Sequence, residues 1–181
     1  GVAGILLFVL GCHLPAEAPA PQTFASWVRE GLPGVDSVPA IRLAASTSSS
    51  AVQVTEVADF QCPSCRVFAL AAWPAILAHY APTGSLDVVV VPYAIHALHP
   101  YATMAAGAAW CAAEQGDVAF MDRIYEAQDT WSSAATVGDA TTSLRSLVTG
   151  TSLDASRFDR CLTAAATRRL LQAAQAAADR I

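Results

Sequence analysis

The sequence predicts an α/β fold in which a strand–helix–strand unit is followed by a largely helical region. Apolar segments with strand-like patterns at 51–60 and 86–92 flank a segment of helical periodicity at about 62–80. From residue 99 onward, apolar residues recur at helical spacing. Because two parallel strands joined by a helix form a right-handed crossover, we expect the helix at 62–80 to cover one face of a sheet.

The composition is that of one globular domain with a short appendage. The chain has 181 residues, of which 54% are hydrophobic and 14% charged, with a net charge of -5. This length is sufficient to enclose a substantial core. All ten basic residues are arginines and they form no cluster, so the sequence gives no support for a nucleic-acid surface.

Residues 1–22 differ in composition from the rest of the chain. The apolar run 1–11 is too short to span a membrane but resembles the core of an export signal. The stretch VLGC that ends at Cys12 resembles the lipobox of bacterial lipoproteins, in which the Cys becomes lipidated. Cleavage after Ala18 and an N-terminal core helix are the alternatives. The Pro- and Ala-rich residues 13–22 are expected to form an extended tether.

Both export interpretations predict the periplasm or the outer face of a bacterial membrane, with lipid attachment at Cys12 under the first. The N-terminal segment would then be the chain's contact with the membrane. Disulfides form and persist in such a compartment, which bears on how the other four cysteines are interpreted.

The domain is expected to begin with a short helix at 23–31 and a strand at 38–43. A stronger strand candidate follows at 51–60, where residues 52, 54, 58 and 60 are apolar and share one face. Glu56 lies in the middle of this face. Either this edge of the strand meets solvent, or a buried acid has a function there.

The next elements surround the stretch Cys62-Pro63-Ser64-Cys65. Pro63 suits the first turn of a helix, which should extend to about Tyr80 with a kink near Pro74. The run 86–92 is apolar between turn residues and fits a strand buried on both faces. Later helices are expected at the following ranges: 100–115, 118–128, 139–148, and 154 to the end with a break near Ala166. Their candidate N-caps are Asp139, Ser152 and Asp154.

Cys62 and Cys65 form the strongest chemical signal in the chain. A thiol at a helix N-terminus faces unpaired N–H groups and the positive end of the helix dipole, which stabilise its thiolate. We therefore predict that Cys62 attacks and that Cys65, one turn further on, resolves the mixed disulfide. A structural disulfide and a zinc site are the alternatives; His96 and His99 could serve as zinc ligands, but the chain has no second Cys-x-x-Cys.

Several stretches, in order, resemble the DsbA-like thiol:disulfide oxidoreductases over roughly residues 50–181. They are Val57-Ala58-Asp59-Phe60-Gln61-Cys62-Pro63-Ser64-Cys65, His99-Pro100-Tyr101-Ala102, Ala109-Trp110-Cys111-Ala112-Ala113-Glu114-Gln115-Gly116 and Arg157-Phe158-Asp159-Arg160-Cys161-Leu162. The resemblance implies a thioredoxin fold with an inserted helical domain. Residues 23–98 would be the N-terminal part of the thioredoxin-like domain, and 99–181 the insertion and the helix after it. The family continues with a Thr-Pro loop and closing strands, which are missing from a chain that stops at Ile181.

The resemblance also assigns roles. Glu56 matches the family's acid beneath the disulfide and would help to move the proton of Cys65. Phe60, Pro63 and Ser64 would support the motif, and Ser64 replaces the His of the strongly oxidising members, which predicts a less oxidising potential. The implied activity is disulfide exchange with cysteines of client proteins, without a cofactor or metal, and with a redox partner that resets the pair. The alternatives are a reductase or isomerase of the same fold, and a lipoprotein module that binds peptides without catalysis.

Cys111 and Cys161 lie on two predicted helices. In an exported protein they are expected to form a structural disulfide, and buried free thiols are the alternative. We interpret His96 and His99 as surface or capping residues, with a lining role near the active site as the alternative. Trp73, Trp110 and Trp131 are expected to be core aromatic residues.

Overall fold

The computed structural model describes residues 39–180. The expectations for the signal-like run, lipidation at Cys12, the tether and the helix at 23–31 fall outside these residues.

A three-stranded mixed sheet forms the centre of the described fold. It contains β1 (Ile41–Ala44), β2 (Val52–Asp59) and β3 (Leu86–Tyr93) in the order β1-β3-β2. β3 runs antiparallel to β1 and parallel to β2, with Glu56 of β2 opposite Val90. Every residue of β3 except the last is buried, as the continuous apolar run predicted.

A nearly continuous helical segment joins β2 to β3. It consists of α2 (Pro63–Val67), a π-helical turn η1 (Phe68–Ala72) and α3 (Trp73–Tyr80). The π turn explains how the helix accommodates Pro74, which has no N–H and would crowd the carbonyl group four residues earlier. A 3₁₀ turn η2 (Ala81–Thr83) and Gly84, whose positive φ of 66° suits glycine, then lead into β3.

The chain beyond β3 is helical in the part that the structure describes. Its helices are α4 (Ala102–Ala113), α5 (Phe120–Glu126), α6 (Gln128–Ser132), α7 (Val137–Ser146), α8 (Ala155–Thr163) and α9 (Ala165–Ala178). We call α4–α8 the helical region. The single helix expected at 118–128 is wrong: α5 ends before Ala127, whose ψ of 7° interrupts the helix, and α6 follows.

Two of the three predicted caps are corrected by the structure. Asp154 caps α8 by accepting a hydrogen bond from the Arg157 N–H, as predicted. The N-cap of α7 is Thr136, whose hydroxyl accepts from the N–H of Asp139, so Asp139 lies in the first turn. Ser152 precedes the N-cap of α8 and is not itself the cap.

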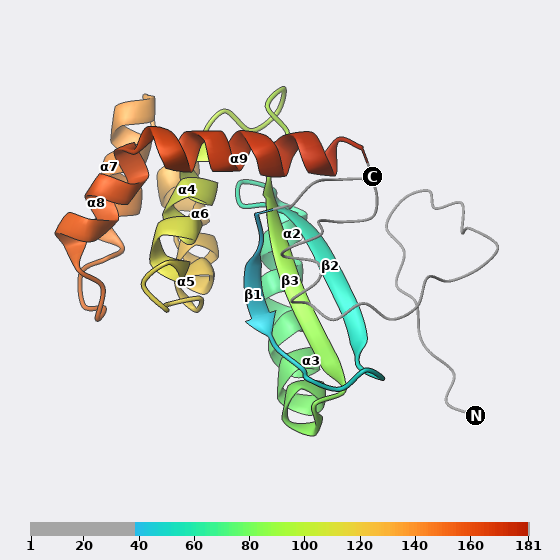
Figure 1. Cartoon of the computed structure of the whole chain (residues 1–181). Helices are drawn as coiled ribbons and strands as arrows, with labels where there is room; N and C mark the ends of the chain where they lie inside the picture. Colours follow the sequence, from blue (N-terminus) through green and yellow to red (C-terminus); the bar gives the residue numbers. More distant parts are fainter. Residues whose placement is uncertain (1–38, 181) are drawn as a thin grey trace.

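The elements form layers around the sheet (Figure 1). The α2–α3 segment lies behind the sheet, the helical region is gathered to one side, and α9 crosses the ends of β2 and β3. α9 returns from the helical region to the sheet, where its Ala174 and Ala177 pack with Val91 of β3. The helical region and α9 therefore close over the end of the sheet at which β2 leads into the two cysteines.

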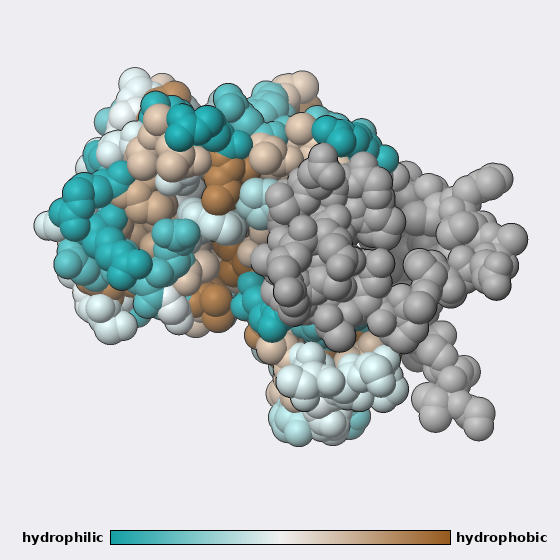
Figure 2. Space-filling model, viewed as in Figure 1, coloured by the Kyte–Doolittle hydropathy of each residue, from teal (hydrophilic) through white to brown (hydrophobic). Residues whose placement is uncertain are grey.

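The main core is shared by the sheet, the α2–α3 segment and the helical region. Figure 2 shows hydrophobic residues along the seam between the helical region and the sheet. Trp73 and Trp131 are buried, and Trp110 packs against the same core while half-buried. Within residues 39–180, no helix has the length and apolar character needed to cross a membrane.

Candidate functional site: the Cys62–Cys65 pair

The two cysteines follow β2 directly. A short loop leads from Asp59 to Cys62, which is the N-cap of α2 with an extended backbone at φ -75° and ψ 123°. The Cys62 N–H donates to the carbonyl oxygen of Asp59, and the Cys62 carbonyl oxygen accepts the first helical bond from Arg66. Pro63 occupies the first turn, where its missing N–H costs nothing. The strand end and the helix start thus fix Cys62 at the helix N-terminus.

Cys65 lies one turn into the helix and differs from Cys62 in its environment. Both thiols are half-buried, and neither is in a disulfide. Burial, together with the charges of Cys62 and Glu56 and against a hydrogen bond with the Asp59 backbone, raises the pKa of the Cys65 thiol to about 12. Cys65 therefore stays protonated at neutral pH unless a base removes its proton.

Glu56 lies on the face of β2 that the α2–α3 segment covers. Its carboxylate accepts a hydrogen bond from the indole Nε1–H of Trp73. Burial raises the pKa of Glu56, while the bond from Trp73 opposes this shift. The sequence left open whether this acid meets solvent or is buried, and the structure shows it partly buried. It lies close enough to Cys65 for its charge to raise the pKa of the thiol.

The residues that flank the cysteines divide into buried and exposed ones. The Phe60 side chain is fully buried and stacks on Tyr125 of α5, with 5.1 Å between ring centroids. Pro63 and Ser64 are exposed, so the outer side of the motif is open to a partner molecule.

Asp59 connects the motif to the start of the helical region, a role the sequence did not suggest. Its side chain is 2% exposed. One carboxylate oxygen accepts from the Gln61 N–H, and the other accepts from the Ile95 N–H and lies 2.8 Å from His99 Nδ1. The expected surface or capping role therefore does not describe His99, which is half-buried against the carboxylate that orders the motif loop, whereas His96 is exposed.

Gln128 of α6 holds the motif from the other side and was also missed. Its amide is 3% exposed and donates to the carbonyl oxygens of Phe60 at 2.8 Å and Cys62 at 3.2 Å. The adjacent Asp129 pairs with Arg66 at 2.8 Å. A helix from a distant part of the chain thus fixes the backbone on which the attacking cysteine is predicted to sit. A buried amide has no local sequence signature that could have revealed this contact.

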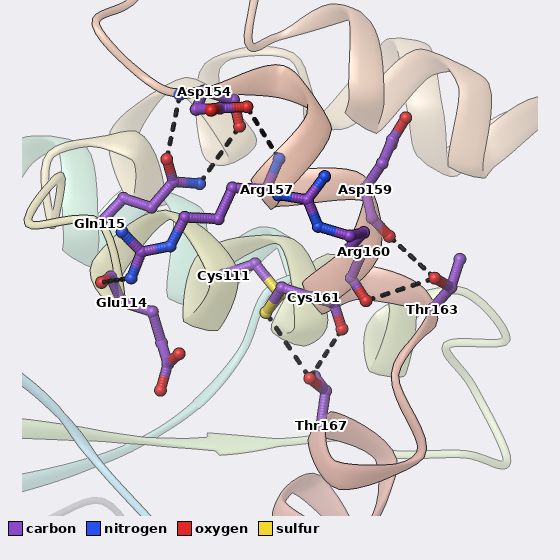
Figure 3. Close-up of a disulfide and its surroundings, with 10 residues drawn as sticks. All are labelled: Cys111, Glu114, Gln115, Asp154, Arg157, Asp159, Arg160, Cys161, Thr163 and Thr167. Atoms are coloured by element: carbon purple, nitrogen blue, oxygen red, sulfur yellow. Dashed lines mark hydrogen bonds between the residues drawn. A yellow bond between two sulfur atoms is a disulfide. The ribbon is translucent and has the colours of Figure 1, made fainter.

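The other two cysteines form a disulfide between α4 and α8 (Figure 3). Cys111 and Cys161 are joined with Cα atoms 5.7 Å apart. The hydroxyl of Thr167, near the start of α9, donates to the Cys161 carbonyl oxygen at 2.7 Å. This disulfide lies within the helical packing and is separate from the Cys62–Cys65 pair.

The residues that the structure describes contain no cluster of three or more His, Cys, Asp or Glu side chains arranged to hold a metal ion. His99, one of the zinc ligands that the sequence left open, lies against Asp59 through its Nδ1. The pair offers three groups for sulfur chemistry: a half-buried thiol at a helix start, a second thiol that holds its proton, and a partly buried carboxyl group.

Comparison with known proteins supports the same fold. A family model described as Thioredoxin (Thioredoxin_4) matches residues 46–181. A solved structure of a variant of alpha-DsbA1 from Wolbachia pipientis has a TM-score of 0.65 and 19% identity, over 79% of this chain and 70% of that one. A thioredoxin-like oxidoreductase from Silicibacter pomeroyi has a TM-score of 0.55 and 22% identity, over 78% and 73%. No curated protein matches the chain significantly.

Proposed function

The chain belongs to the Thioredoxin_4 family of thioredoxins, and from this premise we propose that it is an exported thiol:disulfide oxidoreductase that exchanges a Cys62–Cys65 disulfide with thiols of client proteins. The family match and the solved structures confirm the DsbA-like resemblance and the thioredoxin-like α/β fold with a helical insertion. The observation that carries the proposal is the contrast between Cys62 at the helix N-cap and the protonated Cys65 behind it.

The reaction proceeds by two exchanges of sulfur. A client thiolate attacks Cys62 Sγ of the oxidised pair, a client–Cys62 disulfide forms, and Cys65 leaves as a thiolate that takes up a proton. A second client thiolate then attacks the client sulfur, so that the client gains a disulfide and Cys62 leaves as a thiolate. Two electrons pass from the client to the Cys62–Cys65 pair, and a redox partner must remove them before the next cycle.

Glu56 supplies and accepts the proton of Cys65 in this proposal. Its raised pKa brings it closer to that of the thiol, which suits proton transfer in either direction. When the mixed disulfide is resolved instead, Cys65 gives its proton to Glu56 and attacks Cys62 Sγ, the Cys62–Cys65 bond forms, and the client leaves as a thiolate. The same groups thus serve oxidation, reduction and isomerisation, so the direction depends on the redox potential of the pair.

Single cysteine variants of the full chain test the proposal. Cys62→Ser should abolish exchange, whereas Cys65→Ser should accumulate client disulfides at Cys62, because no resolving thiol remains. Cys111→Ala/Cys161→Ala provides a control that removes two sulfur atoms outside the site. Alkylation of the reduced protein near neutral pH should label Cys62 before Cys65. Labelling in the reverse order would overturn the assignment, and unchanged exchange in Cys62→Ser would overturn the proposed activity.

Two other functions can be distinguished from the proposed one by measurement. A redox potential near that of strongly reducing dithiols would favour a reductase or isomerase over an oxidase. A lipoprotein module that binds peptides would show affinity for extended peptides in the Cys62→Ser/Cys65→Ser variant and no thiol reactivity in the wild type.

For location, we propose that the protein acts at the periplasm or the outer face of a bacterial membrane, attached through Cys12. The support is the apolar run and the VLGC stretch in the sequence. Cell fractionation, with mass spectrometry of the N-terminal peptide, tests it: an acylated Cys12 is expected, and a protein that stays in the cytoplasm with unmodified Cys12 would refute it.

A further inference from the structure

A cavity lies between the sheet, α3 and α5, on the interior side of the Cys62–Cys65 motif. Its volume is about 230 Å³. Glu56, Phe60 and Trp73 line it from the sheet and α3. Met121, Asp122 and Tyr125 line it from α5. The helical region therefore contributes one wall of a cavity that is also lined by Glu56, the partly buried acid of the proposed reaction.

Most of the lining is apolar, and the polar groups that reach the cavity are few. Glu56 has one carboxylate oxygen bonded to Trp73, which leaves its other oxygen for a further partner. Tyr125 is 3% exposed, and its hydroxyl has no hydrogen-bond partner among residues 39–180. Asp122, one turn before Tyr125, is exposed and connects the cavity wall to solvent.

An unpaired hydroxyl at this site needs a physical explanation. Buried polar groups nearly always have a partner, because leaving one unpaired costs stability. Phe would fill this position equally well if packing were the only requirement, because the ring of Tyr125 already stacks on Phe60 with 5.1 Å between ring centroids. The cavity has room for several water molecules, each of which occupies about 30 Å³ in the liquid. Glu56, Tyr125 and Asp122 are the kinds of groups that hold such waters.

We propose that Tyr125 is a positioning residue for proton transfer at Cys65: its hydroxyl holds water in this cavity against the Glu56 carboxyl group, and this water carries protons between Glu56 and solvent near Asp122. The proposal rests on the proposed function, in which Glu56 exchanges a proton with Cys65. On resolution, the Cys65 thiol gives its proton to Glu56 and attacks Cys62 Sγ, the Cys62–Cys65 disulfide forms, and the client leaves as a thiolate. The water passes one proton from Glu56 to solvent and the client thiolate takes one from solvent, so Glu56 returns to its starting protonation state while the cysteine pair is oxidised.

The charges that face Tyr125 are consistent with a hydroxyl that orients water without ionising. Burial raises its pKa, and the negative charges of Cys65, Glu56, Asp59 and Cys62 raise it further. Asp122 approaches the cavity from α5, and desolvation together with the charge of Glu126 raises its pKa. The Tyr125 hydroxyl thus remains a hydrogen-bond donor throughout the pH range in which the enzyme would work.

The test separates the two thiol steps by stopped flow. Reduced full-length protein is mixed with the aromatic disulfide dithiobisnitrobenzoate, which forms an adduct at Cys62 that Cys65 then resolves. In Tyr125→Phe we expect the rate of adduct formation to be unchanged. The rate of resolution should fall by about tenfold, which is somewhat less than the rate enhancement that a side chain contributes when it transfers the proton directly. The pH profile of resolution should also shift, while the melting temperature stays equal or rises.

Tyr93→Phe is the matched control, because it removes a hydroxyl that is bonded to Asp179 away from the cavity. Asp122→Asn provides a second test. The side chain is exposed, so the substitution should not affect folding, and it should slow resolution as Tyr125→Phe does. Unchanged resolution rates and pH profiles in both Tyr125→Phe and Asp122→Asn would overturn the inference. Normal disulfide exchange by the wild type would in that case leave the proposed function standing. A wild type without any exchange would overturn both.

Discussion

Glu56 holds its carboxyl group against the indole of Trp73, on the face of the sheet that the α2–α3 segment covers. An ionised carboxylate loses much of its hydration there, and burial accordingly raises its pKa. Because the folded-state pKa lies above the unfolded one, the contribution of Glu56 to stability is fully present below the unfolded pKa. It is lost as the pH rises through the folded pKa.

Glu56→Gln should therefore stabilise the reduced protein at neutral pH. Gln is neutral at every pH and can still accept the hydrogen bond from Trp73, so it avoids the cost of a buried charge. The difference from wild type should vanish as the pH falls below the unfolded value of about 4.3. Urea unfolding at a series of pH values measures it. A variant that is less stable than wild type at neutral pH would show that the carboxylate, rather than its neutral form, is the favoured state.

The residues of the site could be predicted from the sequence only where their signal is local. Cys62 and Cys65 are identified by their own spacing, and Glu56 by the alternation of a single strand. Tyr125 and Gln128 reach the site from helices that begin about 60 residues later, and what distinguishes them is burial. Burial of an isolated Tyr or Gln depends on tertiary packing, so no pattern in their own segments marks them.

At the scale of elements, α6 is a short helix whose contribution is to hold another element. Gln128 donates to two carbonyl oxygens of the motif loop, and Asp129 pairs with Arg66 of α2. The Gln128 bonds are buried, whereas the Asp129 carboxylate is 84% exposed. Water screens the exposed ion pair, so the buried amide is the contact expected to fix the position of α2 against α6.

Gln128→Leu should lower stability by about 1–3 kcal/mol, because it leaves the Phe60 and Cys62 carbonyl oxygens without this donor. We also expect slower attack by Cys62, since the loop that positions it becomes less constrained. Asp129→Asn is the control and should change stability by less than about 1 kcal/mol. Chemical denaturation and the rate of adduct formation at Cys62 give the two measurements. If both variants behaved alike, the amide would have no special part in holding the loop.

Element types were more predictable than their ends. The strands at 51–60 and 86–92 follow from alternation and a continuous apolar run, and the structure places each within about two residues of these limits. The cap of α7 shows why ends are harder: Thr136 and Asp139 both have side chains suited to capping. Their spacing is that of a capping box, in which the first residue caps and the fourth lies inside the helix.

At the scale of the whole molecule, the helical region and the sheet are joined twice along the chain. The first connection follows β3, and the second is α9, which packs on β3 through Ala174 and Ala177. The Cys111–Cys161 disulfide lies between these connections and joins α4 to α8 just before α9 begins. It therefore fixes the helix from which the chain turns back to the sheet.

We expect peptide mass spectrometry of protein purified without reductant to find Cys111 linked to Cys161. The link encloses a sequence separation of 50 residues. Because such a cross-link restricts the unfolded chain, Cys111→Ala/Cys161→Ala should lose roughly 2–4 kcal/mol of stability. Disulfide exchange at Cys62 should persist at temperatures where the variant is folded, since the pair lies outside the site. Two free thiols at these positions in the purified protein, or equal stability of variant and wild type, would contradict this structural role.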